Sequence, residues 1–306
     1  MRKLHFVFAA LGALFLSVSA HAEKLRVVAT LPDLAALAQQ LGGDHVQVES
    51  LARASEDPHF VDARPSFVRL LNQADVLIEG GAGLEAGWLE PLVQNARNPT
   101  IQTGKSGRVV ASAGLTLLDV PASLDRSQGD VHPQGNPHYM LDPEAVSKVA
   151  ATIAAGLSQV DAAHAHDYAA ELRKFQEQLN GAKSKWIEQF SACKGARVVA
   201  YHKSFDYLLK RYGLELAGTI EPKPGIEPSP AHIAHLVRDA KAAGVKVVIA
   251  ESFRPQKTAE RVASETGAQY VALPLLAGAD DSAKDYFSWM NLVVSRLSEA
   301  CGRTAK

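Results

Sequence analysis

The feature that most constrains this chain is an alternation of short apolar strands with helices that occurs twice. Strands are predicted at residues 25–29, 46–51 and 75–79 in the first half, and at 196–200, 214–220, 245–250 and 269–273 in the second. The helices predicted between them include 32–41 and a helix from residue 64 in the first half, and 229–244 and 257–266 in the second. Strands that alternate with helices form a parallel sheet with helices on its faces. We therefore expect an α/β fold with two lobes.

A long helical stretch separates the two halves. Residues 162–190 contain no proline, and their large apolar side chains recur at the three- and four-residue spacings of an amphipathic helix. The helical pattern begins earlier, near residue 143, and we expect Gly156 and Asp161 to divide it. A helix of this length is stiff, so it should limit hinge motion between the lobes.

The first 22 residues are predicted to be an export signal. Arg2 and Lys3 precede an apolar stretch at 6–18, which is followed by the small residues Ala20 and Ala22. This order is typical of a cleaved signal peptide, and an uncleaved membrane anchor is the alternative. No cysteine follows the apolar stretch, so we expect a periplasmic protein without a lipid anchor. The predicted organisation is a signal peptide at 1–22, an N-terminal lobe at 23–155, a connecting helix at 156–192 and a C-terminal lobe at 193–306.

Charge and cysteine content narrow the classes of function. The 306-residue chain has a formal net charge of −1 and no basic patch, so nothing indicates binding to nucleic acid or to an anionic membrane. Cys193 and Cys301 are the only cysteines. In an oxidising compartment they are expected to form a disulfide, although two separate buried thiols are the alternative. There is no CxxC pair to indicate redox catalysis.

Three histidines stand at predicted turns that lie far apart in the chain. His59 and His138 each follow a proline, and His59 and His202 both lie just past the carboxyl end of a predicted strand. Open α/β sheets bind ligands at the carboxyl ends of their strands, and a neutral imidazole offers a lone pair to a metal. Two facing lobes would bring His59, His138 and His202 into one crevice, where three nitrogen ligands suit zinc.

The other histidines of the mature chain are weaker candidates. Most are expected at a surface turn or on helix faces: His45, His164, His166, His232 and His235. His132 lies in the polar loop 127–135 and is expected to touch a metal only transiently. For any single histidine a structural role is the simpler interpretation, and only the joint placement of three at turns favours metal binding.

Several motifs, taken together and in order, resemble the periplasmic metal-binding proteins of zinc and manganese ABC importers, the cluster A-I solute-binding family. They are Asp57-Pro58-His59, Asn136-Pro137-His138-Tyr139-Met140-Leu141-Asp142-Pro143, His202-Lys203-Ser204-Phe205-Asp206 and Glu227-Pro228-Ser229-Pro230. The resemblance implies two lobes, each with a four-stranded, mainly parallel sheet, joined by one long rigid helix, with a metal held between them. Its ligands fall on His59, His138 and His202. Manganese-type members tend to have glutamate at the third position, so the resemblance favours the zinc type.

The chain departs from this family in two places. The family's fourth ligand, an aspartate after the last strand, has no counterpart in residues 272–276. The fourth position is left to water, Asp280, Asp281 or Glu251, whereas Asp285 is less suited because 282–285 resembles a helix capping box. The loop 118–134 is short and contains only one histidine, His132, so we do not expect it to collect metal.

The leading hypothesis is a carrier that binds Zn²⁺ and delivers it to an ABC-type permease, with a periplasmic metal donor as a further partner and a monomeric state. The same role for Mn²⁺ or Fe²⁺ is the nearest alternative. Three histidines and a water also form catalytic zinc sites, so a zinc hydrolase is a second alternative, although no HExxH motif is present. A third alternative is an interaction protein with a structural metal. We do not expect an enzyme.

Overall fold

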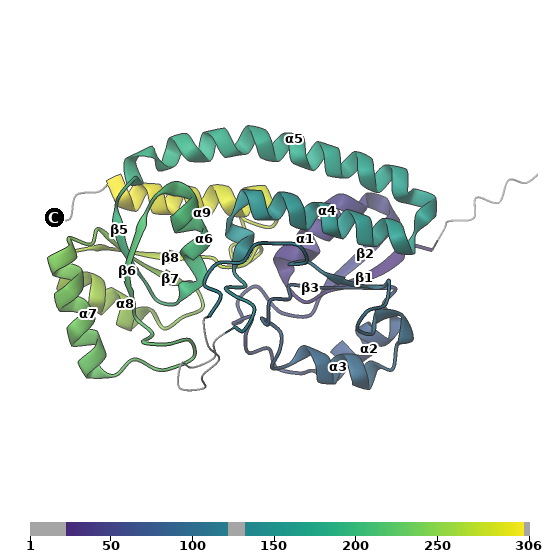
Figure 1. Ribbon diagram of the computed structural model, residues 1–306, viewed down its shortest axis with the longest axis horizontal. Helices are drawn as coiled ribbons and strands as arrows, with labels where there is room; N and C mark the ends of the chain where they lie inside the picture. The colour runs from purple at the N-terminus through teal and green to yellow at the C-terminus, as the bar shows by residue number, and fades with distance from the viewer. Residues whose placement is uncertain (1–22, 122–131, 303–306) are drawn as a thin grey trace, which may run out of the picture.

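Two parallel four-stranded sheets form the centres of two lobes in the computed structural model, which describes residues 23–121 and 132–302 (Figure 1). The N-terminal sheet has the order β2-β1-β3-β4 and consists of β1 (Leu25–Ala29), β2 (Val46–Ser50), β3 (Val76–Glu79) and β4 (Arg108–Val110). The C-terminal sheet has the order β6-β5-β7-β8 and consists of β5 (Arg197–Ala200), β6 (Glu215–Thr219), β7 (Val247–Glu251) and β8 (Gln269–Leu273). Every strand pair is parallel, which confirms the predicted fold class.

Helices cover these sheets and close the connections between strands. The N-terminal half contains α1 (Pro32–Gly42), α2 (Pro65–Gln73), α3 (Leu89–Ala96) and α4 (Pro143–Val160). The connecting helix is α5 (Ala165–Gln189), and the C-terminal half contains α6 (Asp206–Tyr212), α7 (Pro230–Ala243), α8 (Gln256–Thr266) and α9 (Tyr286–Gly302). Short 3₁₀ turns include η1 (Gly43–His45), η2 (Pro99–Ile101), η4 (Tyr139–Leu141), η5 (Ala162–His164), η6 (Phe190–Cys193) and η7 (Lys203–Phe205).

The long helix α5 runs along one side of the molecule over both lobes (Figure 1). It packs on α4 and α1 of the N-terminal half and on α9 of the C-terminal half. Its buried side chains are those that the helical spacing predicted to face inward, including Tyr168, Phe175 and Trp186. The prediction of a helix break at Gly156 is wrong, because α4 continues to Val160, and the interruption comes at Asp161 and the 3₁₀ turn η5. A side chain at Gly156 would overlap Val109, so the glycine allows α4 to pack closely on β4.

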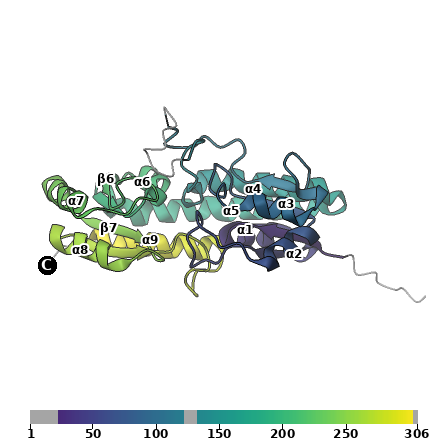
Figure 2. The same ribbon diagram turned by 90° about the horizontal axis from the view of Figure 1, so that it is seen from below.

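The apolar interior is divided unequally between the lobes. One continuous core includes the N-terminal sheet, α4, α5, α9 and the inner face of the C-terminal sheet. A separate, smaller core lies between the C-terminal sheet and helices α7 and α8. Figure 2 shows these two helices at the end of the molecule farthest from α2 and α3. The outer layer of the C-terminal lobe is therefore packed independently of the rest of the interior.

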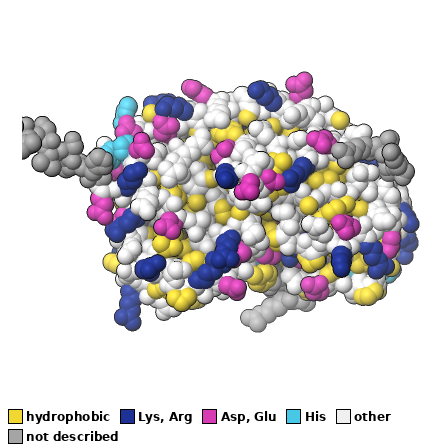
Figure 3. Space-filling view, turned by 180° about the vertical axis from the view of Figure 1, so that it is seen from behind, with side chains coloured by type: hydrophobic (Ala, Val, Ile, Leu, Met, Phe, Trp, Pro, Cys, Tyr) yellow, Lys and Arg dark blue, Asp and Glu magenta, His cyan; other side chains and the backbone are white. Residues whose placement is uncertain are grey.

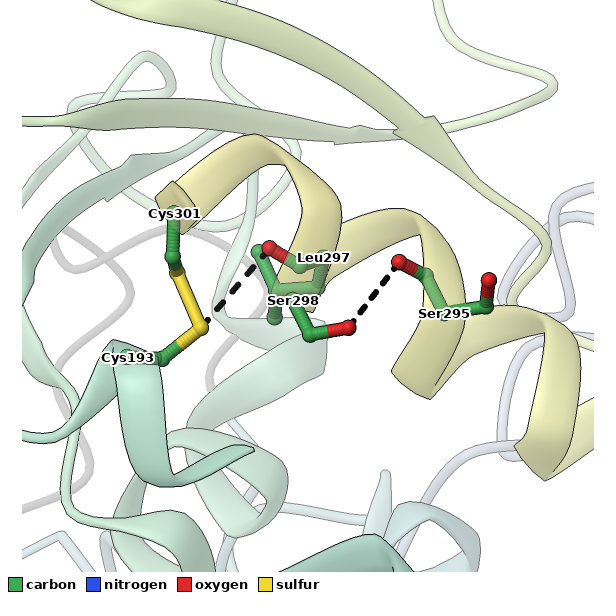
Figure 4. Close-up of a disulfide and its surroundings, with 5 residues drawn as sticks. All are labelled: Cys193, Ser295, Leu297, Ser298 and Cys301. Carbon is green, nitrogen blue, oxygen red and sulfur yellow. Dashed lines mark hydrogen bonds between the residues drawn. A yellow bond between two sulfur atoms is a disulfide. The ribbon is translucent and has the colours of Figure 1, made fainter. Parts of the chain in front are cut away.

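A disulfide fixes the last helix to the start of the C-terminal lobe, as predicted. Cys193 in η6 is bonded to Cys301 in the last turn of α9, with 5.3 Å between the two Cα atoms (Figure 4). The N-terminus of α9 differs from the prediction. Asp285 itself accepts hydrogen bonds from the backbone N–H groups of Phe287 and Ser288, so Asp285 and not Ser282 caps the helix.

Two surface properties bear on the predicted classes of function. Within residues 23–121 and 132–302, no helix is both long and apolar enough to cross a membrane. Lysine, arginine, aspartate and glutamate side chains are interspersed over the face shown in Figure 3, without a field of one sign. The predicted signal peptide at 1–22 lies outside the described residues.

Candidate metal centre

His59 stands in a tight turn after β2, which a tryptophan and an aspartate hold in place. The backbone N–H of Phe60 donates to the carbonyl of Asp57, and the Trp88 indole donates to the carbonyl of Pro58. Oδ1 of Asp57 accepts from both the backbone N–H of His59 (3.0 Å) and its ring Nδ1 (2.7 Å). The Asp-Pro-His sequence therefore fixes the ring of His59 through its own turn and leaves Nε2 without a role in that turn.

His138 stands immediately before η4, on a loop that contacts the opposite lobe. Its backbone N–H donates to Oδ1 of Asn136, and the amide of Asn136 donates to the carbonyl of Lys203, next to His202. The hydroxyl of Tyr207 donates to the carbonyl of Asn136. Asn136 thus fixes the loop of His138 to the loop of His202. Nε2 of His138 is buried and has no hydrogen-bond partner.

His202 follows β5 and precedes η7, in an extended conformation. Its ring Nδ1 lies 2.8 Å from Oε2 of Glu221, which follows β6, the neighbouring strand in the sheet. Both side chains are buried. The carboxyl ends of adjacent parallel strands bring these two residues together, as expected for a ligand site in an open α/β sheet.

The three predicted histidines meet between the lobes. Their ring centroids are separated by 5.1 Å for His59 and His138, 5.3 Å for His59 and His202, and 5.4 Å for His138 and His202. His132 joins them, because its Nε2 lies 3.1 Å from Nε2 of His59. One nitrogen from each of His59, His132 and His138 lies within 4.8 Å of the other two, which is the spacing of a group that could hold a metal ion.

Carboxylates on the Nδ1 atoms of two of these rings are partners that the sequence analysis missed. Asp57 holds His59, and Glu221 holds His202. Metal-binding histidines commonly donate their second ring N–H to a carboxylate or a carbonyl, which orients the ring and raises its basicity. The position of Glu221, two residues after β6, was a signal that could have identified it, since carboxyl ends of strands face ligands.

Arg254 connects the two carboxylates across the lobes. Its guanidinium nitrogens lie 3.2 Å from Oδ2 of Asp57 and 3.3 Å from Oε1 of Glu221. A third carboxylate, Glu251, lies 3.8 Å away and is fully buried. Asp57 belongs to the N-terminal lobe, whereas the other residues belong to the C-terminal lobe. Arg254 therefore supplies a charged link between the halves at the centre of the site.

Burial and neighbouring charges shift the pKa values at this centre. Burial, followed by the charges of His59 and His202, lowers the pKa of His132 to about 4. Burial, followed by the same neighbours, holds the pKa of His138 well below its usual range. Burial alone would raise the pKa of Asp57, but its hydrogen bond and charge interaction with His59 outweigh burial and lower it. His132 and His138 are therefore neutral near pH 7, with lone pairs free.

The residues considered for the fourth ligand are not brought to the histidines. Oδ1 of Asp280 accepts from Ser282, and its Oδ2 pairs with Arg296. Asp281 is exposed to solvent, and Glu251 lies beside Arg254. Among the described residues, the group that could hold a metal consists of histidines alone.

Most of the other histidines lie elsewhere. Figure 3 shows histidine side chains at one end of the back face. His45 stacks on His164 with 3.9 Å between ring centroids, and each of the two rings has its own aspartate partner. No three ligand atoms in this patch approach one another closely enough to hold a metal within the part of the chain that the structure describes. His235 is exposed on α7.

A cavity of about 280 Å³ opens beside the histidines. His132, His138 and His202 line it, together with the prolines that follow Glu221. The cavity therefore borders three of the four clustered histidines. Imidazoles supplied by two α/β lobes, at the end of such a cavity and braced by a rigid helix, define a metal-binding protein of the solute-binding class.

Comparisons with known proteins identify the family. The family model described as the periplasmic component A of the zinc-uptake complex (ZnuA) matches residues 27–300, and the chain belongs to this family. The chain is 26% identical over 290 residues to the iron-binding protein YfeA of Yersinia pestis, covering 92% of this chain and 88% of that protein.

Solved structures agree with this assignment. A crystal structure of ZnuA is similar with a TM-score of 0.76 and 25% identity, covering 92% of this chain and all of that one. The solute-binding protein FpvC of Pseudomonas aeruginosa, solved in complex with Mn²⁺, has a TM-score of 0.77 and 26% identity, covering 91% and 98%. This chain is therefore a metal-binding substrate-binding protein of the ABC importers for zinc, manganese or iron. The family consists of solute-binding proteins and not of enzymes, which excludes the hydrolase alternative.

Proposed function

We propose that this protein captures Zn²⁺ between its lobes in the periplasm and delivers it to the membrane permease of an ABC importer. The observation that supports this best is the close approach of imidazole rings from both lobes, with 5.1–5.4 Å between the ring centroids of His59, His138 and His202. His59 and His202 use Nδ1 for a carboxylate, so their Nε2 atoms are left for a ligand. Nε2 of His138 is buried and unpaired. A buried unpaired acceptor is costly unless a ligand satisfies it.

The proposed zinc ligands are His59, His138 and His202. Zinc accepts nitrogen ligands in a tetrahedral arrangement, whereas manganese favours carboxylate and carbonyl oxygen. Asp57 and Glu221 are close to the rings, but their oxygens are engaged by imidazole nitrogens and by Arg254. The donor atoms that remain are nitrogens, which favours zinc.

Manganese or iron in the same carrier role is the second candidate. It is favoured by the similarity to YfeA, named as an iron-binding protein, and to FpvC, solved with Mn²⁺. The two candidates differ in cargo and not in mechanism, so one measurement separates them. Competition titrations of Zn²⁺ against Mn²⁺ and Fe²⁺ on the purified mature protein should give one metal per chain and a clear preference for zinc.

Alanine variants test the ligand assignment. His59→Ala, His138→Ala and His202→Ala should each weaken Zn²⁺ binding by about 100-fold or more, because loss of even an outer partner of a metal ligand costs 10- to 100-fold. His235→Ala removes an exposed imidazole from α7 and is the matched control. Wild-type zinc affinity in all three site variants would contradict the ligand assignment. A preference for Mn²⁺ over Zn²⁺ would leave the ligand assignment intact but would contradict zinc as the transported metal.

Export and delivery are part of the same proposal. A signal peptide cleaved near Ala22, with no lipid anchor, would leave a periplasmic protein that begins near Glu23. Mass spectrometry of the protein from a periplasmic extract should give that N-terminus. A monomer with a rigid α5 would present its metal to the permease with only loop rearrangement, and a periplasmic metal donor would load it.

A further inference from the structure

We propose that His132 is the fourth ligand of the metal, which would make the site a four-histidine centre. The proposal rests on the proposed zinc-binding function and names the donor that the family pattern leaves missing in this chain. His132 precedes His138 in the chain, and its half-buried side chain lies beside those of His59 and His138. Its Nε2 lies 3.1 Å from Nε2 of His59.

The two facing nitrogens both carry lone pairs when their rings are neutral. Nδ1 of His59 lies 2.7 Å from Asp57, and an ionised carboxylate can only accept, so the proton of a neutral ring belongs on Nδ1. His132 hydrogen-bonds the backbone of Gly83, and its Nδ1 is the ring atom that faces this glycine. Two lone pairs at 3.1 Å repel each other unless a proton or a cation lies between them.

The spacing matches what zinc would impose. With Zn–N bonds of about 2.0–2.1 Å and tetrahedral angles, two ligand nitrogens are separated by roughly 3.3–3.4 Å. The separation of the Nε2 atoms of His59 and His132 is within a few tenths of an ångström of this value. The pair is also part of the group whose third member is His138, with the nitrogens within 4.8 Å of one another.

The backbone beside His132 has a conformation that favours glycine. Gly83 has a φ of +83°, and a Cβ atom there would lie 3.7 Å from Nδ1 of His132. The glycine therefore lets the backbone turn beneath the ring and present a hydrogen-bonding group to Nδ1. This is the arrangement seen for metal-binding histidines, in which the second ring nitrogen has a backbone or carboxylate partner.

The fourth nitrogen would sharpen metal selection. Four neutral imidazoles form a donor set that suits zinc, whereas manganese favours oxygen ligands. With water in place of His132, one oxygen donor would return to the set. His132 should therefore contribute more to zinc affinity than to manganese affinity. Its removal should lower the ratio of zinc affinity to manganese affinity.

The test compares wild type with His132→Ala and His132→Gln, with His235→Ala as control. X-ray absorption of the zinc-loaded proteins should count four imidazoles in wild type and His235→Ala, and three in both His132 variants. Zinc affinity should fall about tenfold or more in the His132 variants, with a smaller change for Mn²⁺. Melting temperatures of the metal-free proteins identify any variant that is misfolded. If one His132 variant is misfolded, the comparison with wild type rests on the other.

The outcomes separate this inference from the proposed function. Three imidazoles in wild type, together with unchanged zinc affinity in both His132 variants, would overturn the fourth-ligand assignment and leave the three-histidine carrier intact. Absence of stoichiometric zinc in wild type would contradict the proposed function itself. A loss of zinc affinity in His132→Ala with four imidazoles retained would also overturn the assignment, since His132 would then act only through packing.

Discussion

The N-terminal half supplies His59, His132 and His138 to the centre, whereas the C-terminal half supplies one imidazole, His202, and the cation Arg254. The two sheets nevertheless have equivalent strand orders. The interior also differs, because the N-terminal sheet shares one core with α4, α5 and α9, while α7 and α8 close a separate core. Equivalent topologies therefore contribute unequally to the site: one half brings three of the clustered imidazoles, and the other brings one imidazole and Arg254.

The largest effect should come from the covalent link of the C-terminal lobe. Replacing both Cys193 and Cys301 by serine removes a cross-link that spans 108 residues. The loop-closure model gives a loss of about 5 kcal/mol in the free energy of unfolding. Denaturant titration of the metal-free protein measures it, and reduced wild type should behave like the double variant. A loss below about 1 kcal/mol would show that the smaller C-terminal core is sufficient without the bond.

Two buried carboxyl groups should make the N-terminal lobe sensitive to pH. Burial raises the pKa of Asp33 and of Glu85 to about 7 each, from the values of 3.8 and 4.5 in the unfolded chain. Between about pH 4 and 7 the unfolded state has released these protons and the folded state retains them, so stability falls as pH rises.

Asp33→Asn should flatten this dependence, with a difference from wild type on the order of 3 kcal/mol across that range. Glu85 is the poorer position to change, because it accepts from Thr30 and from two backbone N–H groups. Unfolding of the metal-free protein, measured at several pH values, gives the two curves. Parallel curves for wild type and Asp33→Asn would show that Asp33 is ionised in the folded protein.

The carboxylates of Asp57 and Glu221, each of which pairs with Nδ1 of a histidine ring, allow the two lobes to be compared at the site itself. Asp57→Asn and Glu221→Gln should each weaken Zn²⁺ binding by 10- to 100-fold, because each removes the charged partner of a ring Nδ1. The larger loss is expected for Asp57→Asn, since Asp57 also accepts from the backbone of its own turn. Glu215→Gln is the control. Glu215 lies on β6, is exposed and pairs with Arg197 away from the site. A larger loss of zinc affinity for Glu221→Gln would contradict the expectation that the carboxylate of the N-terminal lobe contributes more than that of the C-terminal lobe.

Much of the fold could be predicted because its signals are local. The strands are short apolar runs bounded by glycine, proline or polar residues, and β7 is buried along its whole length. The missed strand, β4, has only three residues, of which Val109 alone is buried, so it has no periodicity to detect. The division into lobes at 23–155 and 193–306 with a connecting helix at 156–192 stays a prediction.

The partners at the site could not be predicted, because they are set by how distant segments meet. His59 and His132 are separated by 73 residues, and Arg254 joins carboxylates from opposite lobes. His59 and His202 were identified from the ends of predicted strands, and His138 from a turn before the predicted connecting helix, which are all local signals. His132 lies in a polar loop with no such signal, and only the approach of that loop to His59 shows its importance.

The smallest expected effects concern how closely helices pack on the two sheets. Gly156 of α4 faces Val109 of β4, and a Cβ atom there would overlap a branched side chain with little freedom to move. In the C-terminal lobe, a Cβ atom at Gly218 would lie 2.7 Å from Cδ1 of Leu236, the far end of a flexible side chain. Gly156→Ala should therefore cost about 1–3 kcal/mol, and Gly218→Ala less than about 1 kcal/mol.

Thermal and denaturant unfolding of the two variants measures this difference, with Gly181→Ala as a control. Gly181 lies within α5, and a Cβ atom there has no neighbour within 4 Å, so alanine should stabilise the helix slightly. Equal costs at Gly156 and Gly218 would mean that α4 can shift on its sheet as readily as Leu236 can rotate. The N-terminal lobe would then be no more rigid than the C-terminal one, although it brings three of the four clustered imidazoles to the site.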